Sequence, residues 1–156
     1  MNIVGIDGAT KHTGISLFTD DKYSNSRAID CSKITNSSIR LNEMILNIYA
    51  VLKFYEPNEV VMEDSWVGEN KNVARMISEI LGAVRGFCAS NKIVFIEYEP
   101  CAWRALVDLP TGRNKRELLK KMAVERVKKE YGICVTDDEA ESILITQARV
   151  NERKKR

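Results

Sequence analysis

The chain has 156 residues, of which 44% are hydrophobic and 29% charged, and its net charge is only +2. This length and composition suit a single domain, residues 1–156, that buries a core without disulfide or metal staples. No segment approaches the length of a membrane span and the first residues lack a signal-peptide pattern, so we expect a soluble cytoplasmic domain.

The first half of the chain predicts four strands and one helix. Apolar runs bounded by turn residues predict the strands, which cover 3–7, 13–18, 27–32 and 60–63. The helix begins at the cap Asn36 and ends before Pro57, with apolar residues at helical spacing between them. The last strand is an uninterrupted apolar run, which is typical of a strand buried on both faces.

The second half alternates helices with one more strand. Apolar residues at helical spacing predict a long helix over 73–87, and a strand over 93–96 follows it. A short helical piece lies around Trp103, a basic helix ends at Gly132 as its C-cap, and a last helix begins near Thr136. A meander of strands that then alternate with helices indicates an α/β fold, with a five-stranded mixed sheet flanked by α-helices.

The cysteines do not suggest a metal or disulfide framework. Cys31, Cys88, Cys101 and Cys134 are widely separated, and the chain has only one histidine. This spacing favours neither a zinc knuckle nor paired disulfides. We therefore expect four reduced thiols in the core.

Basic residues are concentrated between residues 113 and 131. This segment holds eight lysines and arginines against three glutamates. A solvated helix face and a phosphate-binding surface explain such a run equally well. The residues from Arg149 onward are basic as well, and there the plain alternative is a frayed tail.

Two acids end apolar runs that should lie in the middle of the sheet. Asp7 ends the first strand and Glu63 ends the fourth. If these strands pair in parallel, their backbones lie about 4.8 Å apart and the two carboxylates can share a cation. Taken singly, a turn aspartate before Gly8 and a surface acid at a strand end are the simpler interpretations. Together they are less satisfactory, because both acids end strongly buried strands.

A third group of acids opens the last helix. Thr136 and Glu139 fit a capping box, and acids in a first helical turn favour the helix dipole, which explains Asp137 and Glu139 without any function. Glu141 is not explained in this way. With Asp138 it heads an apolar helix face, where an unpaired acid is costly to desolvate. Carboxylate oxygens with almost no histidine select hard Mg²⁺ or Mn²⁺, and such sites serve phosphoryl transfer.

Together these motifs resemble the RuvC-type Holliday junction resolvases of the ribonuclease H-like superfamily, and in particular their compact phage relatives. The matching elements are Ile3-Val4-Gly5-Ile6-Asp7 with Thr13-Gly14, Val61-Met62-Glu63 with an aromatic residue three positions later, Glu97-Tyr98, Lys115 at a helix start, and the acids Asp138 and Glu141. Their order and spacing over nearly the whole chain carry the resemblance. The last acid is Glu141 where cellular relatives have aspartate, and Asp137 leaves the match of its neighbour ambiguous by one residue.

The resemblance implies a Mg²⁺-dependent endonuclease, with Mn²⁺ as a substitute, that nicks Holliday junctions and related branched DNA as a homodimer in a bacterium or a phage-infected host. Its catalytic metal ligands would be Asp7, Glu63, Asp138 and Glu141. Lys115 would act beside the scissile phosphate, and Trp66 would stack on an unpaired base at the junction. With the basic segment included, the residues expected to contact DNA are Trp66, Arg113, Lys115, Arg116, Lys120 and Lys121.

The long helix over 73–87 offers a surface for the homodimer. Its apolar stripe consists of Val73, Ile77, Ile80 and Val84. Gly82 and Gly86, four residues apart, would permit close approach by another element. Symmetric nicking needs two active sites, and dimers are the commonest oligomers. The alternative is a stripe used wholly for the core.

Two other functions are open. The segment Gly5-Ile6-Asp7-Gly8-Ala9-Thr10 also looks like the first phosphate loop of actin-like ATPases and sugar kinases, but those need two such domains and this chain has room for one. The other is a junction-binding module that has lost catalysis, against which the four acids argue. Mg²⁺-dependent nicking of a four-way junction separates the three functions.

Overall fold

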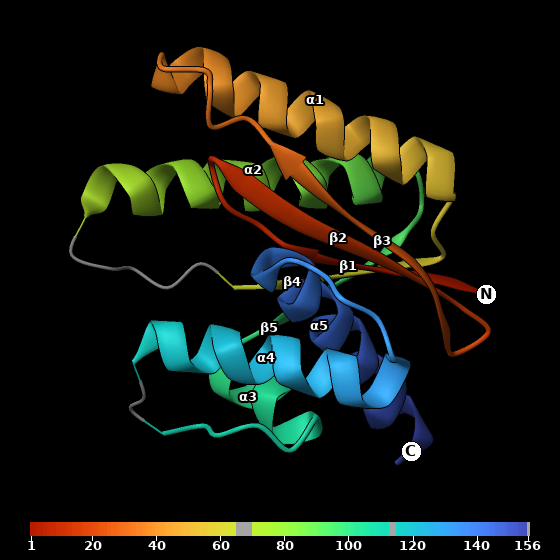
Figure 1. Cartoon of the computed structure of the whole chain (residues 1–156). Helices are drawn as coiled ribbons and strands as arrows, with labels where there is room; N and C mark the ends of the chain where they lie inside the picture. The colour runs from red at the N-terminus through yellow and green to blue at the C-terminus, as the bar shows by residue number, and fades with distance from the viewer. Residues whose placement is uncertain (65–69, 113–114, 156) are drawn as a thin grey trace.

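The computed structural model describes residues 1–64, 70–112 and 115–155, and it shows a five-stranded sheet with helices on both faces (Figure 1). The strands are β1 (Asn2–Asp7), β2 (His12–Thr19), β3 (Lys22–Asp30), β4 (Glu59–Glu63) and β5 (Val94–Tyr98). The helices are α1 (Ser37–Tyr55), α2 (Lys71–Ser90), α3 (Pro100–Leu106), α4 (Arg116–Tyr131) and α5 (Asp137–Lys154). The predicted α/β fold with a mixed sheet is confirmed.

The strand order β3-β2-β1-β4-β5 brings the two strand-end acids together. β1 pairs antiparallel with β2, and β2 with β3, whereas β1 pairs parallel with β4, and β4 with β5. In the parallel pair Ile6 lies opposite Met62. Asp7 and Glu63 are the next residues, so both emerge at the same edge of the sheet. The parallel pairing on which the predicted acidic site depended is therefore present.

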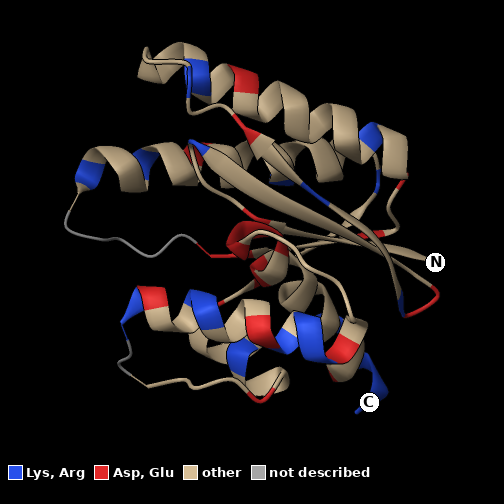
Figure 2. Cartoon of the chain, viewed as in Figure 1, with Lys and Arg blue, Asp and Glu red and all other residues tan. Residues whose placement is uncertain are grey.

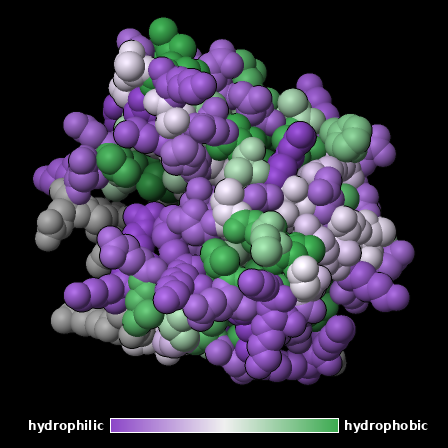
Figure 3. Space-filling view, viewed as in Figure 1, coloured by the Kyte–Doolittle hydropathy of each residue, from purple (hydrophilic) through white to green (hydrophobic). Residues whose placement is uncertain are grey.

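The sheet separates two hydrophobic cores. One core lies under α1 and α2 and contains Ile6 and Met62, and the other lies under α3, α4 and α5 and contains Val61. Because successive strand residues point to opposite faces, Asp7 and Glu63 share the face that α5 covers. The outer surface in the view of Figure 3 is mostly hydrophilic, with small hydrophobic patches.

α5 packs unusually close to the sheet because two strand residues lack a side chain. A Cβ atom built on Gly14 would lie 1.9 Å from the carbonyl oxygen of Asp138, and one on Gly5 would lie 1.9 Å from Thr146 Oγ1. Between them the Ser16 hydroxyl contacts Thr146 Oγ1 at 2.7 Å and donates to the carbonyl of Ser142 at 2.9 Å. These contacts bring the acidic start of α5 over the end of β1.

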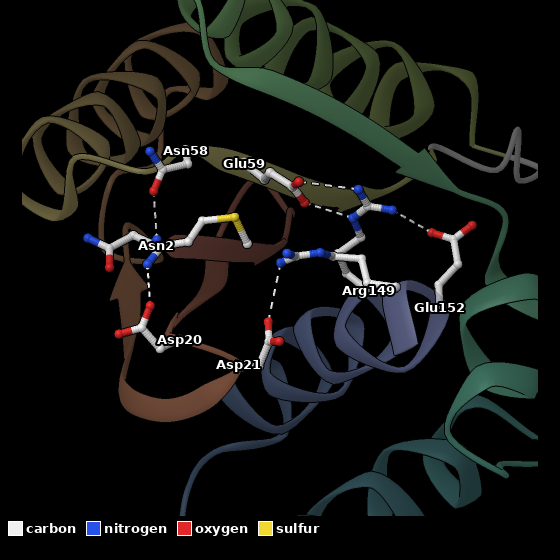
Figure 4. A network of polar contacts seen from close by, with 9 residues as sticks. Asn2, Asp20, Asp21, Asn58, Glu59, Arg149 and Glu152 are labelled. Carbon is white, nitrogen blue, oxygen red and sulfur yellow. Dashed lines mark hydrogen bonds and ion pairs between the residues drawn. The ribbon is translucent and has the colours of Figure 1, made fainter. Parts of the chain in front are cut away.

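The far end of α5 is held by ion pairs at the opposite edge of the sheet (Figure 4). Arg149 Nε donates to Glu59 at 2.7 Å and its Nη1 donates to Glu152 at 2.7 Å, while Arg153 reaches Asp21 at 3.2 Å. The helix rise from Glu141 to Arg149 is about 12 Å, and the strand rise from Glu59 to the end of β4 is about 13 Å. The ion pairs thus hold the helix in register with β4. Because α5 continues to Lys154, the frayed tail, one of the two alternatives for this segment, is wrong for the described residues.

The third strand begins earlier than predicted. It was expected over 27–32, but β3 starts at Lys22 and ends at Asp30. Asp20 and Asp21 form the connection with β2 and both have positive φ, 50° and 63°. A two-residue hairpin turn requires this left-handed backbone, which aspartate tolerates better than most residues. The polar edge strand after it lacks the apolar pattern by which a strand is recognised.

One expectation about packing is wrong. Cys31 and Cys88 are buried as predicted, but Cys101 and Cys134 are exposed, because they lie outside both cores. A Cβ built on Gly82 or Gly86 has no described atom within 4 Å beyond its own helix, so no other described element approaches these two glycines. That they would permit such an approach stays a prediction.

α2 uses much of its predicted dimer stripe for the core. Ile80 and Val84 are completely buried within the chain, whereas Val73 is exposed.

Across the described ranges, none of the helices is both long and apolar enough to cross a membrane.

Candidate metal centre

The charges of three of the predicted acids act on the fourth, Asp7, at the end of β1. Burial raises the pKa of Asp7 well above its ordinary value, and the charges of Glu141, Glu63 and Asp138 raise it further, in that order. The charge of Lys120 opposes this shift. Two elements thus bring acids near Asp7: β4 through its parallel register with β1, and α5 through its close packing on Gly14. Such crowding of carboxylates is stable only if protons or cations compensate it.

Glu63 and Glu141 are two further acids of this group that burial affects. Burial raises the pKa of both carboxyl groups. For Glu63 the hydrogen bond from Trp103 and the charge of Arg104 act in the opposite direction, and for Glu141 the charge of Lys120 does. Both acids therefore lie in a poorly hydrated site in which a cation is favoured.

The two neighbouring aspartates at the start of α5, Asp137 and Asp138, have different surroundings. Thr136 and Glu139 form the predicted capping box, so the helix begins as the sequence indicates. Asp138 acts on Asp7 and its side chain is 16% exposed, whereas the side chain of Asp137 is 42% exposed and turns to Lys120. The geometry therefore favours Asp138 over Asp137 as the member of the acidic group.

Lys120 was predicted to contact DNA, but the structure places its ammonium group against the acids. Its Nζ lies 2.6 Å from Asp137 Oδ2 and 3.2 Å from Asp138 Oδ1. Burial alone would lower the pKa of Lys120, but the hydrogen bonds and charges of the two aspartates raise it. Nothing in the sequence links this lysine to acids on the next helix, because only the packing of α4 on α5 brings them together.

Trp103 and Arg104 are site residues that sequence reasoning missed. Trp103 Nε1 donates to Glu63 Oε2 at 2.5 Å, and Arg104 Nη2 lies 3.7 Å from the same oxygen. Trp103 was expected only as part of a short helix. The sequence offered one indication of its role: a tryptophan that is buried in a core needs a hydrogen-bond acceptor for its indole N–H.

The remaining predicted basic residues lie on the surface. Lys115 is the N-cap of α4, Arg116 is its first residue, and both are exposed. Lys121 is exposed beside Glu125. Figure 2 shows the acidic start of α5 between basic residues at the first turns of α2 and α4. The predicted contacts Trp66 and Arg113 lie outside the described residues.

The donor set fits a hard divalent cation. Within residues 1–64, 70–112 and 115–155, no three His, Cys, Asp or Glu side chains are close enough to hold a metal ion as they stand. The four acids nevertheless offer only oxygen atoms, and the raised pKa of Asp7 shows that their negative charges are poorly compensated. A dication relieves this repulsion and suits all-oxygen ligands.

The raised pKa of Asp7 predicts a stability that falls with pH when metal is absent. Folded Asp7 keeps its proton at pH values where unfolded Asp7 has lost it. The stability that this proton contributes is complete below the unfolded pKa and is lost as pH rises through the folded pKa. In EDTA we expect Asp7→Asn to melt at a higher temperature than the wild type at pH 7, with the difference vanishing in acid.

Asp137→Asn is the matched control for this melting experiment, and its expected change in melting temperature has the opposite sign. The hydrogen bond from Lys120 lowers the pKa of Asp137, so its ionised form stabilises the folded chain above the unfolded pKa. Asp137→Asn should therefore lower the melting temperature at pH 7, slightly because this side chain is well exposed. Equal melting curves of Asp7→Asn and the wild type across this pH range would contradict the strain assigned to Asp7.

Known proteins of one family match nearly the whole chain. The profile of the family described as crossover junction endodeoxyribonuclease RuvC matches residues 3–145. RuvC of Caldicellulosiruptor saccharolyticus is 25% identical over 158 residues, which cover 96% of this chain and 92% of the relative. RuvC of Fusobacterium nucleatum is 25% identical over 97% of this chain and 80% of the relative.

Solved structures share the fold at low sequence identity. T. thermophilus RuvC in complex with a Holliday junction substrate superimposes with a TM-score of 0.78 at 15% identity, over 99% of this chain and 96% of that chain. The Fowlpox virus resolvase in complex with substrate Holliday junction DNA gives a TM-score of 0.68 at 16% identity, over 98% of this chain and 99% of that chain.

Proposed function

The chain belongs to the RuvC family of crossover junction endodeoxyribonucleases, and we propose that it nicks Holliday junctions and related branch points at the acidic site around Asp7. The family match spans residues 3–145 and so includes all four acids. It also favours an endonuclease over the phosphate-loop ATPases that share a similar first strand. Nucleases of this family depend on metal ions.

The observation that carries the site assignment is the crowding of carboxylates on Asp7. Asp7 is desolvated and repelled by Glu141, Glu63 and Asp138, with Lys120 as the opposing charge. A purely structural aspartate would be paired with a cation or hydrogen-bond donors in full. We assign the four acids as ligands of Mg²⁺, for which Mn²⁺ can substitute.

Each chain residue at the site has a distinct task. A metal bound by the four acids would supply an activated water and charge compensation at the leaving oxygen. Lys115 and Arg116 at the exposed start of α4 would hold the phosphodiester strand. Lys120 sets the position of Asp138 through its 3.2 Å contact.

The DNA path follows the basic residues around the acids. Lys71 and Arg75 at the start of α2 and Arg116 at the start of α4 lie on either side of the start of α5 (Figure 2). Phosphate contacts of this kind position the duplex arms without reading sequence. Trp66 and Arg113 belong to the same proposed interface, as do Lys115 and Lys121, with Trp66 stacking at the branch point.

We further propose that the enzyme acts as a homodimer, because two symmetric nicks require two sites. Ile80 and Val84 belong to the core, so the exposed surface of α2, including Val73, is the part of the predicted stripe that can contact a second copy. Light scattering at micromolar concentration tests this. A monomer that still cuts both strands of a junction would contradict it.

The function is tested with labelled DNA of several shapes. The purified chain is incubated with a four-way junction, a flap, a linear duplex and an RNA–DNA hybrid, each with Mg²⁺ or with EDTA. We expect paired nicks in the four-way junction with Mg²⁺, weaker cutting of the flap, and none in EDTA. Junction binding without cleavage under all conditions would indicate a binding module that has lost catalysis.

Variants of two neighbouring lysines, Lys120 and Lys121, should distinguish an effect on turnover from an effect on DNA affinity. Lys120 lies against the acids with its side chain 22% exposed, whereas Lys121 is 74% exposed. Lys120→Ala should lower turnover on the four-way junction by about 10–100-fold, the usual loss when a partner of a metal ligand is removed. Lys121→Ala should change only affinity, by less than about tenfold because a single phosphate contact is lost. Single-turnover rates and binding curves distinguish the two, and equal behaviour would remove the site role of Lys120.

A further inference from the structure

We propose that Trp103 is a positioning residue for the metal centre: its indole N–H holds Glu63 by Oε2 and leaves Oε1 as the ligand atom. Trp103 is 1% exposed, and its Nε1 donates to Glu63 Oε2 at 2.5 Å. This inference rests on the proposed function, because it assigns a task to a residue behind one of the four acids.

Both donors around Glu63 converge on one carboxylate oxygen. Trp103 Nε1 and Arg104 Nη2 each approach Oε2, at 2.5 and 3.7 Å. Oε1 accepts no hydrogen bond from any residue that the structure describes. The two oxygens of Glu63 thus have different surroundings before any metal binds, and Oε1 remains available as a ligand atom.

The donor itself has little freedom to move. Trp103 lies in the core formed with Val61 and Ile143, and the guanidinium of Arg104 stands 5.0 Å from the centre of its ring. A rigid neutral donor fixes the carboxylate without adding a second cation that would compete with the metal. Hydrogen-bond partners of metal ligands typically contribute about 10–100-fold in metal affinity.

The plain alternative is that Glu63 serves only as the acceptor that a buried indole needs. The two explanations differ in their dependence on metal. If Glu63 binds metal through Oε1, its charge is shared and the hydrogen bond at Oε2 weakens. If the contact is only structural, metal leaves the indole N–H unchanged.

Nuclear magnetic resonance of the intact chain tests this without activity. The sequence contains two tryptophans, so ¹⁵N-indole labelling gives two signals, and Trp66→Phe assigns the remaining one to Trp103. We expect the Trp103 N–H to resonate far downfield without metal and to move upfield in a saturable way as Mg²⁺ is added. A Trp103 signal that stays fixed while backbone amides near Asp138 respond would overturn the proposal.

A variant pair measures the size of the effect. Trp103→Phe keeps an aromatic ring and removes the N–H. Tyr98→Phe is the control: Tyr98 lies beside Glu63 in the sheet, but its hydroxyl donates to Glu152 at 2.7 Å, so this variant loses a hydrogen bond to a carboxylate outside the four acids. Binding of Mn²⁺ is followed by the paramagnetic resonance of the free ion. We expect the dissociation constant to rise about 10–100-fold in Trp103→Phe and to stay within about twofold in Tyr98→Phe.

The outcomes separate this inference from the proposed function. If the wild type binds no metal, the metal site itself is wrong and the role of Trp103 falls with it. If the wild type binds metal and Trp103→Phe binds equally well, only the positioning role is wrong. Equal losses in both variants would mean that general destabilisation, and not the hydrogen bond to Glu63, weakens the site.

Discussion

Asp7→Asn, Glu63→Gln, Asp138→Asn and Glu141→Gln are each expected to lower cleavage of a four-way junction by at least about 1,000-fold. A metal ion at a phosphoryl-transfer site contributes several kcal/mol, and each 1.4 kcal/mol is a tenfold change in rate. The largest loss is expected for Asp7, on which the other three acids act. Rates are measured at saturating enzyme so that affinity does not enter.

These variants should still bind the junction. They remove metal ligands and leave the basic surface intact, and removing negative charge weakens no phosphate contact. Asp137→Asn is the internal control, because Asp137 turns to Lys120 and its side chain is the more exposed of the two aspartates. It should reduce cleavage by no more than about tenfold. Full activity of Glu141→Gln with loss in Asp137→Asn would mean that α5 is rotated relative to the site described above.

Gly14→Ala is expected to have the largest effect on stability. Its new Cβ would lie 1.9 Å from the backbone oxygen of Asp138, and backbone cannot move aside as the end of a side chain can. Overpacking of this kind costs about 1–3 kcal/mol when side chains relax, so a backbone clash should reach at least the upper end. Because α5 must lift from β2, Asp138 and Glu141 leave Asp7 and cleavage is lost as well.

Gly82→Ala is the matched control for the same chemical change. A Cβ on Gly82 meets no described atom within 4 Å beyond its own helix, and alanine favours a helix over glycine by about 1 kcal/mol. Chemical denaturation should therefore show opposite signs for the two variants. Unchanged unfolding and cleavage in Gly14→Ala would contradict the close packing of α5 on the sheet.

Local patterns in the sequence predicted the elements that depend on neighbouring residues. The cap and capping box at Thr136 and Glu139 and the left-handed C-cap at Gly132 lie where they were expected. β3 was displaced, because its hairpin uses Asp20 and Asp21 in the left-handed region where Asn-Gly is the usual pair. Burial of the cysteines was only half right, since the sequence does not say which side of a short helix or loop meets a core.

The acidic site was predictable for a similar reason. Asp7 and Glu63 end buried strands, and Asp138 and Glu141 share one helix face, so the strand and helix periods alone group them in pairs. Two features of the tertiary structure bring these acids together. β1 lies parallel to β4, and the absence of a side chain at Gly14 lets α5 pack closely on the sheet. The sequence indicates that β1 and β4 are strands and that residue 14 is a glycine. It does not say which strand pairs with which, or which helix packs against the glycine.

The sequence by itself determined most of the elements, the sheet type and the choice of four candidate acids, because each depends on the period of side chains along one strand or helix. Only the tertiary structure decided which residues control those acids. Lys120 reaches Asp138 from another helix, and Trp103 reaches Glu63 across 40 residues of chain. Contacts between distant segments depend on how layers pack, on side-chain length and on which polar groups burial leaves in need of a partner. Such contacts follow no regular spacing along the chain, so the pattern of residues in the sequence does not predict them.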